Sequence, residues 1–286
     1  MSEPPHNPAP AIRSVLHPTD FSHRSDRAFA HALAVALTRQ AKLTLLHVGP
    51  ESKKRVRWSR FPAVRRTLEQ WGVLESGSPR SAVYDQLNMR VKKVAVPGLQ
   101  PVRATADYLA DYPADLVVLA TEARSGLPRW IDPSVAEPLA RKANTLTLFV
   151  PTAARRGIID AKTGDLRLRS ILVPVDQTLD YRGAMELARN AAVTLGKDVV
   201  KITLAHVGSD PIDWPQLEDG PHWRWQVVQF AGDPVSQILG AAGQLEADLI
   251  VMPTQGHDGI LDMLRGSTTE QVLRMANCPV LAVPAR

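Results

Sequence analysis

Short apolar runs alternate with helix-spaced patterns along the chain. In its C-terminal part, strands are predicted at residues 171–175, 200–207, 226–230, 249–252 and 280–283, and helices at 181–195, 235–245 and 267–276. The nearly all-apolar run from Leu249 to Met252 is typical of a strand in a parallel sheet that is covered on both faces. This alternation predicts an α/β fold of parallel βαβ units with right-handed crossovers.

The same sequence blocks occur twice, in the same order. Residues 13–20 (RSVLHPTD) recur as 169–176 (RSILVPVD), and further matches join 43–49 to 202–208, 115–121 to 248–254, and 139–144 to 272–277. Repeated blocks in one order predict two copies of one domain. We expect a disordered, proline-rich tail at 1–11, a first domain at 12–152, a linker rich in charge and glycine at 153–168, and a second domain at 169–286.

The two copies differ after their second strand. The first copy has a long segment at 51–90, with a helical pattern near Pro62 to Gly72, whereas the second has only 209–224 and no clear helix. Charge is also divided, because residues 1–160 carry a net charge of +9 and residues 161–286 carry −4. The two halves could therefore attract each other, or one face could prefer an anionic partner.

Composition places the chain among globular proteins of about two domains. Apolar residues make up 44% and charged residues 22% of its 286 residues. No apolar run approaches the ~18 residues of a membrane helix, so no membrane partner is expected. A single cysteine, Cys278, excludes a disulfide framework and favours a cytoplasmic location.

Candidate chemistry lies where the strands of the second copy end. In open parallel sheets, ligands bind beyond the carboxyl ends of strands, where the strand order reverses. Asp176 follows the first strand, and Pro253-Thr-Gln-Gly256, nine further residues and Gly266-Ser267-Thr268 follow the fourth. Glycines let backbone N–H groups approach an oxyanion, and a helix N-terminus attracts phosphate. The pattern predicts a nucleotide cradle.

These residues resemble the universal stress protein family. Its nucleotide-binding members carry a loop Gly-x2-Gly-x9-Gly-(Ser/Thr), an Asp closing the first strand and a terminal Cys-Pro-Val strand, here Cys278 to Val280. The resemblance covers nearly the whole chain, twice, and identifies it as a tandem member. It implies two doubly wound parallel five-stranded sheets in the order 3-2-1-4-5, the adenine nucleotide alpha hydrolase-like arrangement. It also implies pairing of the last strands, 146–150 with 280–283.

The resemblance further implies binding of ATP, without well-defined catalysis. The candidate contacts in the second domain are Asp176 for the base, Gly256, Gly266, Ser267 and Thr268 for the phosphates, and the backbone of Val207 as a further contact with the ligand. The match is incomplete, because Pro253 replaces the loop's first glycine. In the first copy Ala120, Ala123 and Pro133 replace all three glycines, so we expect no ATP there.

Several of these residues also have structural interpretations. Ser134 and Ser267 each lie three residues before a glutamate, which is the pattern of a helix capping box. Asp20 and Asp176 could each cap the helix that follows, and we favour that role for Asp20. His47 and His206 end the second strand of each copy, and a repeated histidine there is more typical of packing than of chemistry.

A basic run with two aromatic residues covers residues 53–66. It holds seven cations and no anion, with Trp58 and Phe61 among them. A patch for nucleic acid or an anionic membrane is one interpretation. We favour the other, a solvated face whose aromatic residues pack inward, because no recognised nucleic-acid fold accompanies the run.

Two classes of function remain open from the sequence. One is a cytosolic sensor or regulator that binds ATP in its second domain, and the other is a nucleotide-free scaffold with an unknown protein partner. No metal site and no nucleophile motif stand out, and we expect no enzyme. Slow ATP hydrolysis through Asp258 or Asp262 is less favoured, because nothing sets their geometry. A homodimer stays open.

Overall fold

The computed structural model describes residues 11–50, 56–121, 145–176, 180–210, 212–254 and 268–284. The first half contains β1 (Ser14–Thr19), η1 (His23–Ser25), α1 (Asp26–Thr38), β2 (Lys42–Gly49), η2 (Trp58–Arg60), α2 (Val64–Gln70), α3 (Ala82–Asp85), β3 (Val91–Pro97), α4 (Pro101–Asp111), β4 (Leu116–Thr121) and β5 (Leu146–Pro151). The second contains β6 (Leu168–Val175), α6 (Arg182–Leu195), β7 (Gly196–Val207), β8 (Trp223–Phe230), α7 (Pro234–Gln244), β9 (Leu249–Thr254), α9 (Thr268–Met275) and β10 (Val280–Pro284).

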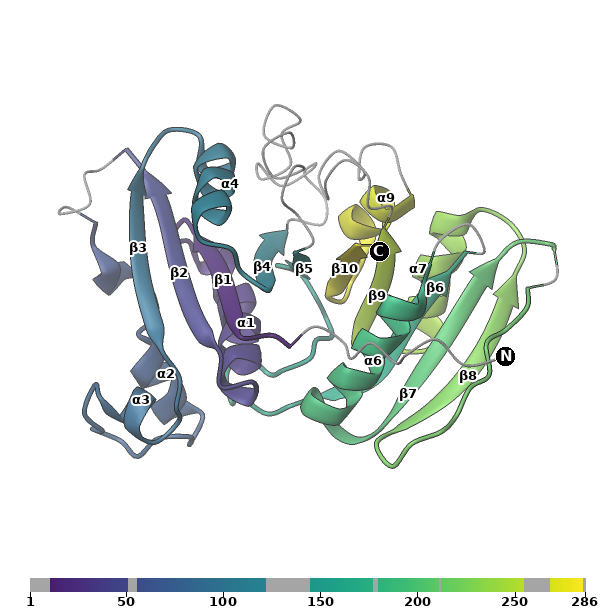
Figure 1. Cartoon of the computed structure of the whole chain (residues 1–286), viewed down its shortest axis with the longest axis horizontal. Helices are drawn as coiled ribbons and strands as arrows, with labels where there is room; N and C mark the ends of the chain where they lie inside the picture. Colours follow the sequence, from purple (N-terminus) through teal and green to yellow (C-terminus); the bar gives the residue numbers. More distant parts are fainter. Residues whose placement is uncertain are drawn as a thin grey trace.

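The described strands form one ten-stranded sheet, in the order β3-β2-β1-β4-β5-β10-β9-β6-β7-β8 (Figure 1). Within each half all strand pairs are parallel, and the order is 3-2-1-4-5 counted along the chain. The predicted α/β class and the predicted repeat of a doubly wound five-stranded sheet are therefore confirmed. The two sheets do not stay separate, however, but merge into one.

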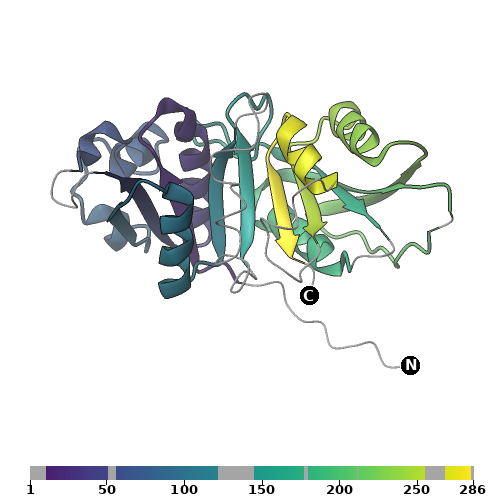
Figure 2. The same ribbon diagram turned by 90° about the horizontal axis from the view of Figure 1, so that it is seen from above.

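The merger runs through the last strand of each half. β10 pairs antiparallel with β5, placing Val280 opposite Phe149 and Ala282 opposite Thr147, so both strands lie between the halves in Figure 2. All residues of both strands are buried. Each apolar edge covers the other, which is the solution that exposed apolar edges favour. The predicted pairing of the last strands within one chain is confirmed.

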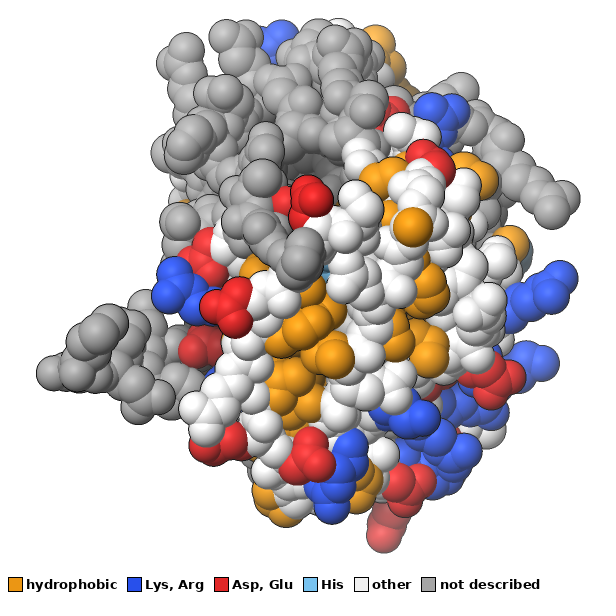
Figure 3. Space-filling view, turned by 90° about the vertical axis from the view of Figure 1, so that its right-hand side faces the viewer, with side chains coloured by type: hydrophobic (Ala, Val, Ile, Leu, Met, Phe, Trp, Pro, Cys, Tyr) orange, Lys and Arg blue, Asp and Glu red, His pale blue; other side chains and the backbone are white. Residues whose placement is uncertain are grey.

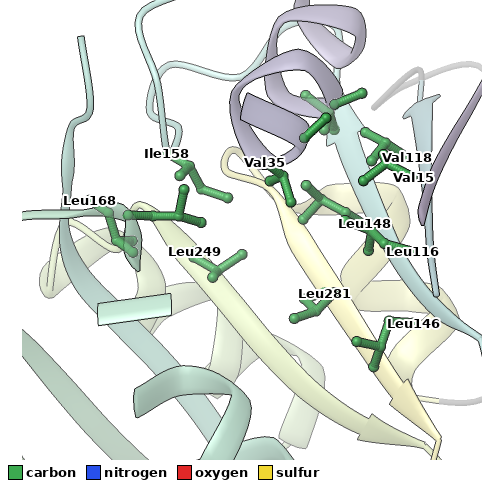
Figure 4. Packing of buried hydrophobic residues seen from close by; sticks show 14 of the residues in the cluster. Val15, Val35, Leu116, Val118, Leu146, Leu148, Ile158, Leu168, Leu249 and Leu281 are labelled. Atoms are coloured by element: carbon green, nitrogen blue, oxygen red, sulfur yellow. The ribbon is translucent and has the colours of Figure 1, made fainter. Parts of the chain in front are cut away.

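Helices cover both faces of the sheet. The buried residues of α1, α2 and α6 pack with one core cluster, and those of α7 and α9 pack with the other, joined by partly buried residues of α4. Both clusters contain strand residues from both halves. Figure 4 shows the first cluster at the junction, where Val35 and Leu148 of the first half lie near Leu249 and Leu281 of the second. The halves therefore share their cores.

The segment 153–168, predicted as a linker, packs against both halves. Arg27 of α1 donates to the carbonyl of Ala154 (2.6 Å), while Arg156 pairs with Glu246 (2.5 Å) of the second half. Ile158 is buried in the shared core. The charged residues of this segment suggest a flexible linker in the sequence. In the structure, one of them, Arg156, forms an ion pair with the second half.

The glycines of this segment have a similar explanation. A Cβ at Gly157 would lie 3.0 Å from Nε2 of His31, and a Cβ at Gly164 would lie 2.4 Å from Cγ of Trp71. A ring of the first half lies against the backbone at both positions, and at Gly164 it leaves no room for a Cβ. The glycines of segment 153–168 therefore reflect close packing against the first half rather than conformational freedom of a linker.

Candidate functional site

The candidate site lies at the carboxyl edge of the second half, where the strand order reverses. The chain passes from β6 to its neighbour β7 and later returns to β9 on the other side of β6. The ladder between β6 and β9 pairs Ile171 with Leu249 and Leu172 with Ile250, and ends three residues before β6 does. The two strands therefore separate toward their carboxyl ends, as at a topological switch point.

Three of the predicted contact residues are described, and all three lie at this edge. Asp176 directly follows β6 and is exposed, Val207 is the last residue of β7, and Thr268 is the first residue of α9. Because Val175 pairs with His206, Asp176 and Val207 follow adjacent paired residues. The structure thus places Asp176 and Val207, two of the predicted ligand contacts, at the ends of adjacent strands. Gly256, Gly266 and Ser267 lie outside the described residues, as do Asp258, Asp262, Ala123, Pro133 and Ser134.

The backbone of Val207 faces β6 rather than β8. Val200 and Gly208 donate their N–H groups to carbonyls of the β8 side, at His222 and Phe230. Because backbone direction alternates along a strand, the N–H and C=O of Val207 point the other way, toward β6. Its carbonyl points to the side on which Asp176 follows β6.

Pro253 lies within β9 rather than in the loop that follows. It pairs with Val283 of β10, and the N–H of Ile250 points toward β10, so the ring nitrogen of Pro253 points toward β6. At that level the β6–β9 ladder has already ended. A proline there costs the sheet no hydrogen bond, but it removes one donor from the separation between the strands.

The same edge of the first half is occupied by the chain's own aromatic rings. Phe21 follows Asp20 at the end of β1 and stacks on His47, with ring centroids 4.0 Å apart and an interplanar angle of 14°. Trp58 meets Phe21 edge-on at 5.3 Å, and Phe61 is buried beneath them. We call Phe21, His47, Trp58 and Phe61 the aromatic cluster.

The sequence patterns did not predict this cluster. Its one signal is the residue after the repeated aspartate, which is Phe21 in the first copy and Gln177 in the second. Phe21 has a φ of 63°, a left-handed conformation that is uncommon for a bulky side chain. The turn holds Phe21 in this conformation, and the ring of Phe21 lies against His47 at the end of the first half.

The repeated histidines have a packing role, as expected. Nδ1 of His47 and Nδ1 of His206 each bond to the carbonyl of the last residue of the preceding strand, at 2.9 and 3.1 Å. Each ring also lies over the glycine two residues later, since a Cβ at Gly49 or Gly208 would come within 2.9 or 2.6 Å of Nε2. The repeated His-Val-Gly therefore locks the ends of two adjacent strands together.

Asp20 does not cap α1, which corrects the expectation. Its carboxylate accepts the N–H of Ser22 at 2.9 Å, and the N-cap residue of α1 is Ser25. The hydroxyl of Ser25 instead donates to the carbonyl of Ser22. A short 3-10 turn separates β1 from α1, so an aspartate at the strand end reaches only that turn.

The described part of the basic run matches a solvated face with inward aromatic residues. Arg57, Arg60 and Arg66 are exposed, whereas Phe61 packs edge-on against Phe29 of α1. Burial, together with the nearby Arg80, lowers the pKa of Lys93, whose ammonium lies 5.3 Å from the Trp58 ring centroid. Residues 53–55 lie outside the described part.

Other chemistry is limited in the part of the chain that is described. Cys278 is buried, and burial raises the pKa of its thiol to about 12, which makes it a poor nucleophile. Among the described residues, no group of three His, Cys, Asp or Glu side chains could hold a metal ion. None of the described helices has the length and apolar character needed to span a membrane.

Comparison with known proteins agrees with the repeat. The family model described as the universal stress protein family matches residues 11–151 and 215–284. A universal stress protein of Mycobacterium tuberculosis H37Rv is 24% identical over 292 residues, covering 92% of this chain and 94% of that protein. One from Methanocaldococcus jannaschii is 46% identical over 52 residues, 18% of this chain and 31% of that protein.

Solved structures share the fold over the whole chain. A universal stress protein from Archaeoglobus fulgidus has a TM-score of 0.56 at 16% identity, covering 96% of this chain and 97% of that one. A protein of unknown function from Pseudomonas aeruginosa PAO1 has a TM-score of 0.58 at 20% identity, covering 96% and 93%. With the family model matching most of both repeats, the chain belongs to the universal stress protein family.

Proposed function

We propose that the protein binds an adenine nucleotide, ATP, at the carboxyl edge of its second half and acts in the cytosol as a sensor or regulator rather than a catalyst. The observation that carries this proposal is the asymmetry between the halves. The aromatic cluster occupies the carboxyl edge of the first half, whereas Asp176, Val207 and the first residue of α9 lie at the same edge of the second.

The base would bind between the ends of β6 and β7. The Asp176 carboxylate can accept a hydrogen bond from the exocyclic amino group of adenine, and the backbone of Val207 offers polar groups on the same side. A site that pairs the amino group with a carboxylate favours adenine over guanine, which has a carbonyl at the corresponding position.

The phosphates would bind at the first turn of α9. The first N–H groups of a helix have no partner within the helix and lie at the positive end of its dipole, so they attract an oxyanion. Thr268 begins this helix, and Gly266 and Ser267 precede it. Glu270 of the same turn pairs with Arg274 at 3.8 Å, which offsets its negative charge near the anion.

Titration calorimetry of the full chain with ATP tests the proposal. We expect a stoichiometry of one ATP per chain, because only the second half would bind. Gly266→Val places a branched side chain where the phosphates should lie, and we expect at least a tenfold loss of affinity, about 1.4 kcal/mol. Gly243→Val in α7, where an added Cβ meets nothing within 4 Å, is the matched control and should bind as the parent does.

A nucleotide-free scaffold is the second candidate function. Pro253 removes a backbone donor at the site, and the first half offers no glycine loop. If the parent protein shows no heat of binding with ATP and native mass spectrometry finds no nucleotide on the purified protein, the scaffold replaces the sensor. Two ATP per chain would instead contradict the role of the aromatic cluster.

A further inference from the structure

The two outer edges of the ten-stranded sheet are protected to different degrees. β3 carries Lys92 and Lys93 and ends at Pro97, and such residues discourage the addition of another strand. β8 at the other edge has eight residues, no proline and one charged residue, Arg224. That arginine is already paired with Asp219 at 3.6 Å, in the loop before the strand.

The backbone of β8 presents alternate residues to the open side. Its even-numbered residues face β7, because the carbonyls of His222 and Phe230 accept N–H groups from the β7 side. The odd-numbered residues, Trp223, Trp225, Val227 and Gln229, therefore direct their N–H and C=O groups away from the sheet.

The preceding loop satisfies the beginning of this row. Gly220 donates its N–H to the carbonyl of Trp223 at 3.2 Å, and the N–H of Trp225 donates to the Asp219 carboxylate at 2.9 Å. Beyond that point, the described residues provide no partner for the Trp225 carbonyl or for the backbone groups of Val227 and Gln229. The open edge is thus defined as Trp225 to Gln229.

Apolar side chains border the open edge. Val227 is 42% exposed, and Trp225 and Val228 are partly exposed on opposite faces of the strand. Figure 3 faces this side of the molecule and shows hydrophobic side chains gathered in its middle, with charged side chains toward the lower border. A row of free backbone groups between apolar side chains is the arrangement that accepts an added strand.

We propose that the occupant is the open edge of a second copy of this chain, paired antiparallel about Val227. In this register Val227 lies opposite Val227 of the second copy, and Trp225 lies opposite Gln229. Each Val227 exchanges two hydrogen bonds with its counterpart, and each Gln229 N–H reaches a Trp225 carbonyl. Asp219 keeps its bond to the Trp225 N–H, which limits the pairing to these residues.

Three features favour a second copy over an unrelated strand. The edge contains no charged residue between Trp225 and Gln229, so self-pairing brings no like charges together. A two-fold axis through Val227 satisfies the same groups on both copies at once. The chain already joins its own halves by antiparallel pairing of β5 and β10, which leaves those strands unavailable to a partner. Because the contact is small, we expect a weak dimer.

Sedimentation velocity of the full chain from about 1 μM to about 1 mM tests this proposal. The parent should approach twice its 31.3 kDa mass as concentration rises. Val227→Lys places two ammonium groups opposite each other and should weaken association at least tenfold. Val199→Lys is the matched control, because Val199 is 48% exposed in β7, away from the open edge, and should associate as the parent does.

The outcome does not depend on nucleotide binding. Circular dichroism of Val227→Lys should match the parent, since an exposed valine is replaced; if that variant fails to fold, Gln229→Lys at the same edge takes its place. A parent that stays monomeric throughout the concentration range overturns the proposal. A dimer that survives the lysine substitution at this edge also overturns it, because the contact must then lie elsewhere.

Discussion

Two buried histidines should make the protein's stability depend on pH between about 4 and 6.5. His17 and His31 are almost completely inaccessible to solvent, and each ring bonds through Nδ1 to a backbone carbonyl, at Val118 (2.9 Å) and Arg27 (2.8 Å). Because a carbonyl only accepts, Nδ1 carries the proton in each ring. Nε2 has no partner among the described residues, so a second proton there would be buried without an acceptor.

Burial accordingly lowers the pKa of both rings from 6.5 to about 4. The carbonyl of Val118 and the charge of Asp20 oppose this at His17, and the carbonyl of Arg27 opposes it at His31, where the Arg27 charge adds to the lowering. Since the unfolded rings bind protons more readily than the folded ones, stability is full above pH 6.5 and is lost as pH falls toward 4. Between pH 7 and pH 5 the loss is about 2 kcal/mol for each ring, or about 4 kcal/mol together.

Urea unfolding followed by tryptophan fluorescence at pH 7 and pH 5 measures this loss. His17→Asn and His31→Asn each keep an N–H donor near the position of Nδ1 but do not titrate, so each should reduce the pH-dependent loss by about 2 kcal/mol. His222→Asn alters an exposed side chain and should leave the loss unchanged. If both buried variants lose as much stability between pH 7 and pH 5 as the parent does, the buried rings are not the source of the pH dependence.

Two further pairs of substitutions test backbone geometry. Phe21→Gly and Phe21→Ala both lose the ring stacked on His47, but only glycine relieves the positive φ, so in thermal melts the glycine variant should be more stable by about 1 kcal/mol; the reverse order would contradict the strain. Gly164→Ala combines a φ of 77° with a Cβ 2.4 Å from the Trp71 ring and should cost about 2 kcal/mol or more, whereas Gly77→Ala, with a φ of 83° and open space, should cost about 1 kcal/mol. Equal losses would show that segment 153–168 does not pack on Trp71.

The order of helices and strands could be predicted from the sequence, because periodicity and repeated blocks are local properties. β9 and β10 lie where their apolar runs predict them. β8 begins at Trp223 rather than at residue 226, because an edge strand is only half buried and its first residues, Trp-Arg-Trp, form no apolar run. The position of the candidate site also followed from the sequence, since aspartate, glycine and helix-start signals mark the carboxyl ends of strands.

The tertiary structure alone decided that aromatic rings fill the carboxyl edge of the first half. Phe21, His47 and Trp58 are separated along the chain, and only the parallel pairing of β1 and β2 brings their rings to one edge. In the same way, Gly164 and Trp71 meet only because segment 153–168 folds back on the first half. Local patterns record which element each residue forms, but contacts between distant residues depend on how the elements pack, and that packing places the aromatic cluster at the carboxyl edge of the first half.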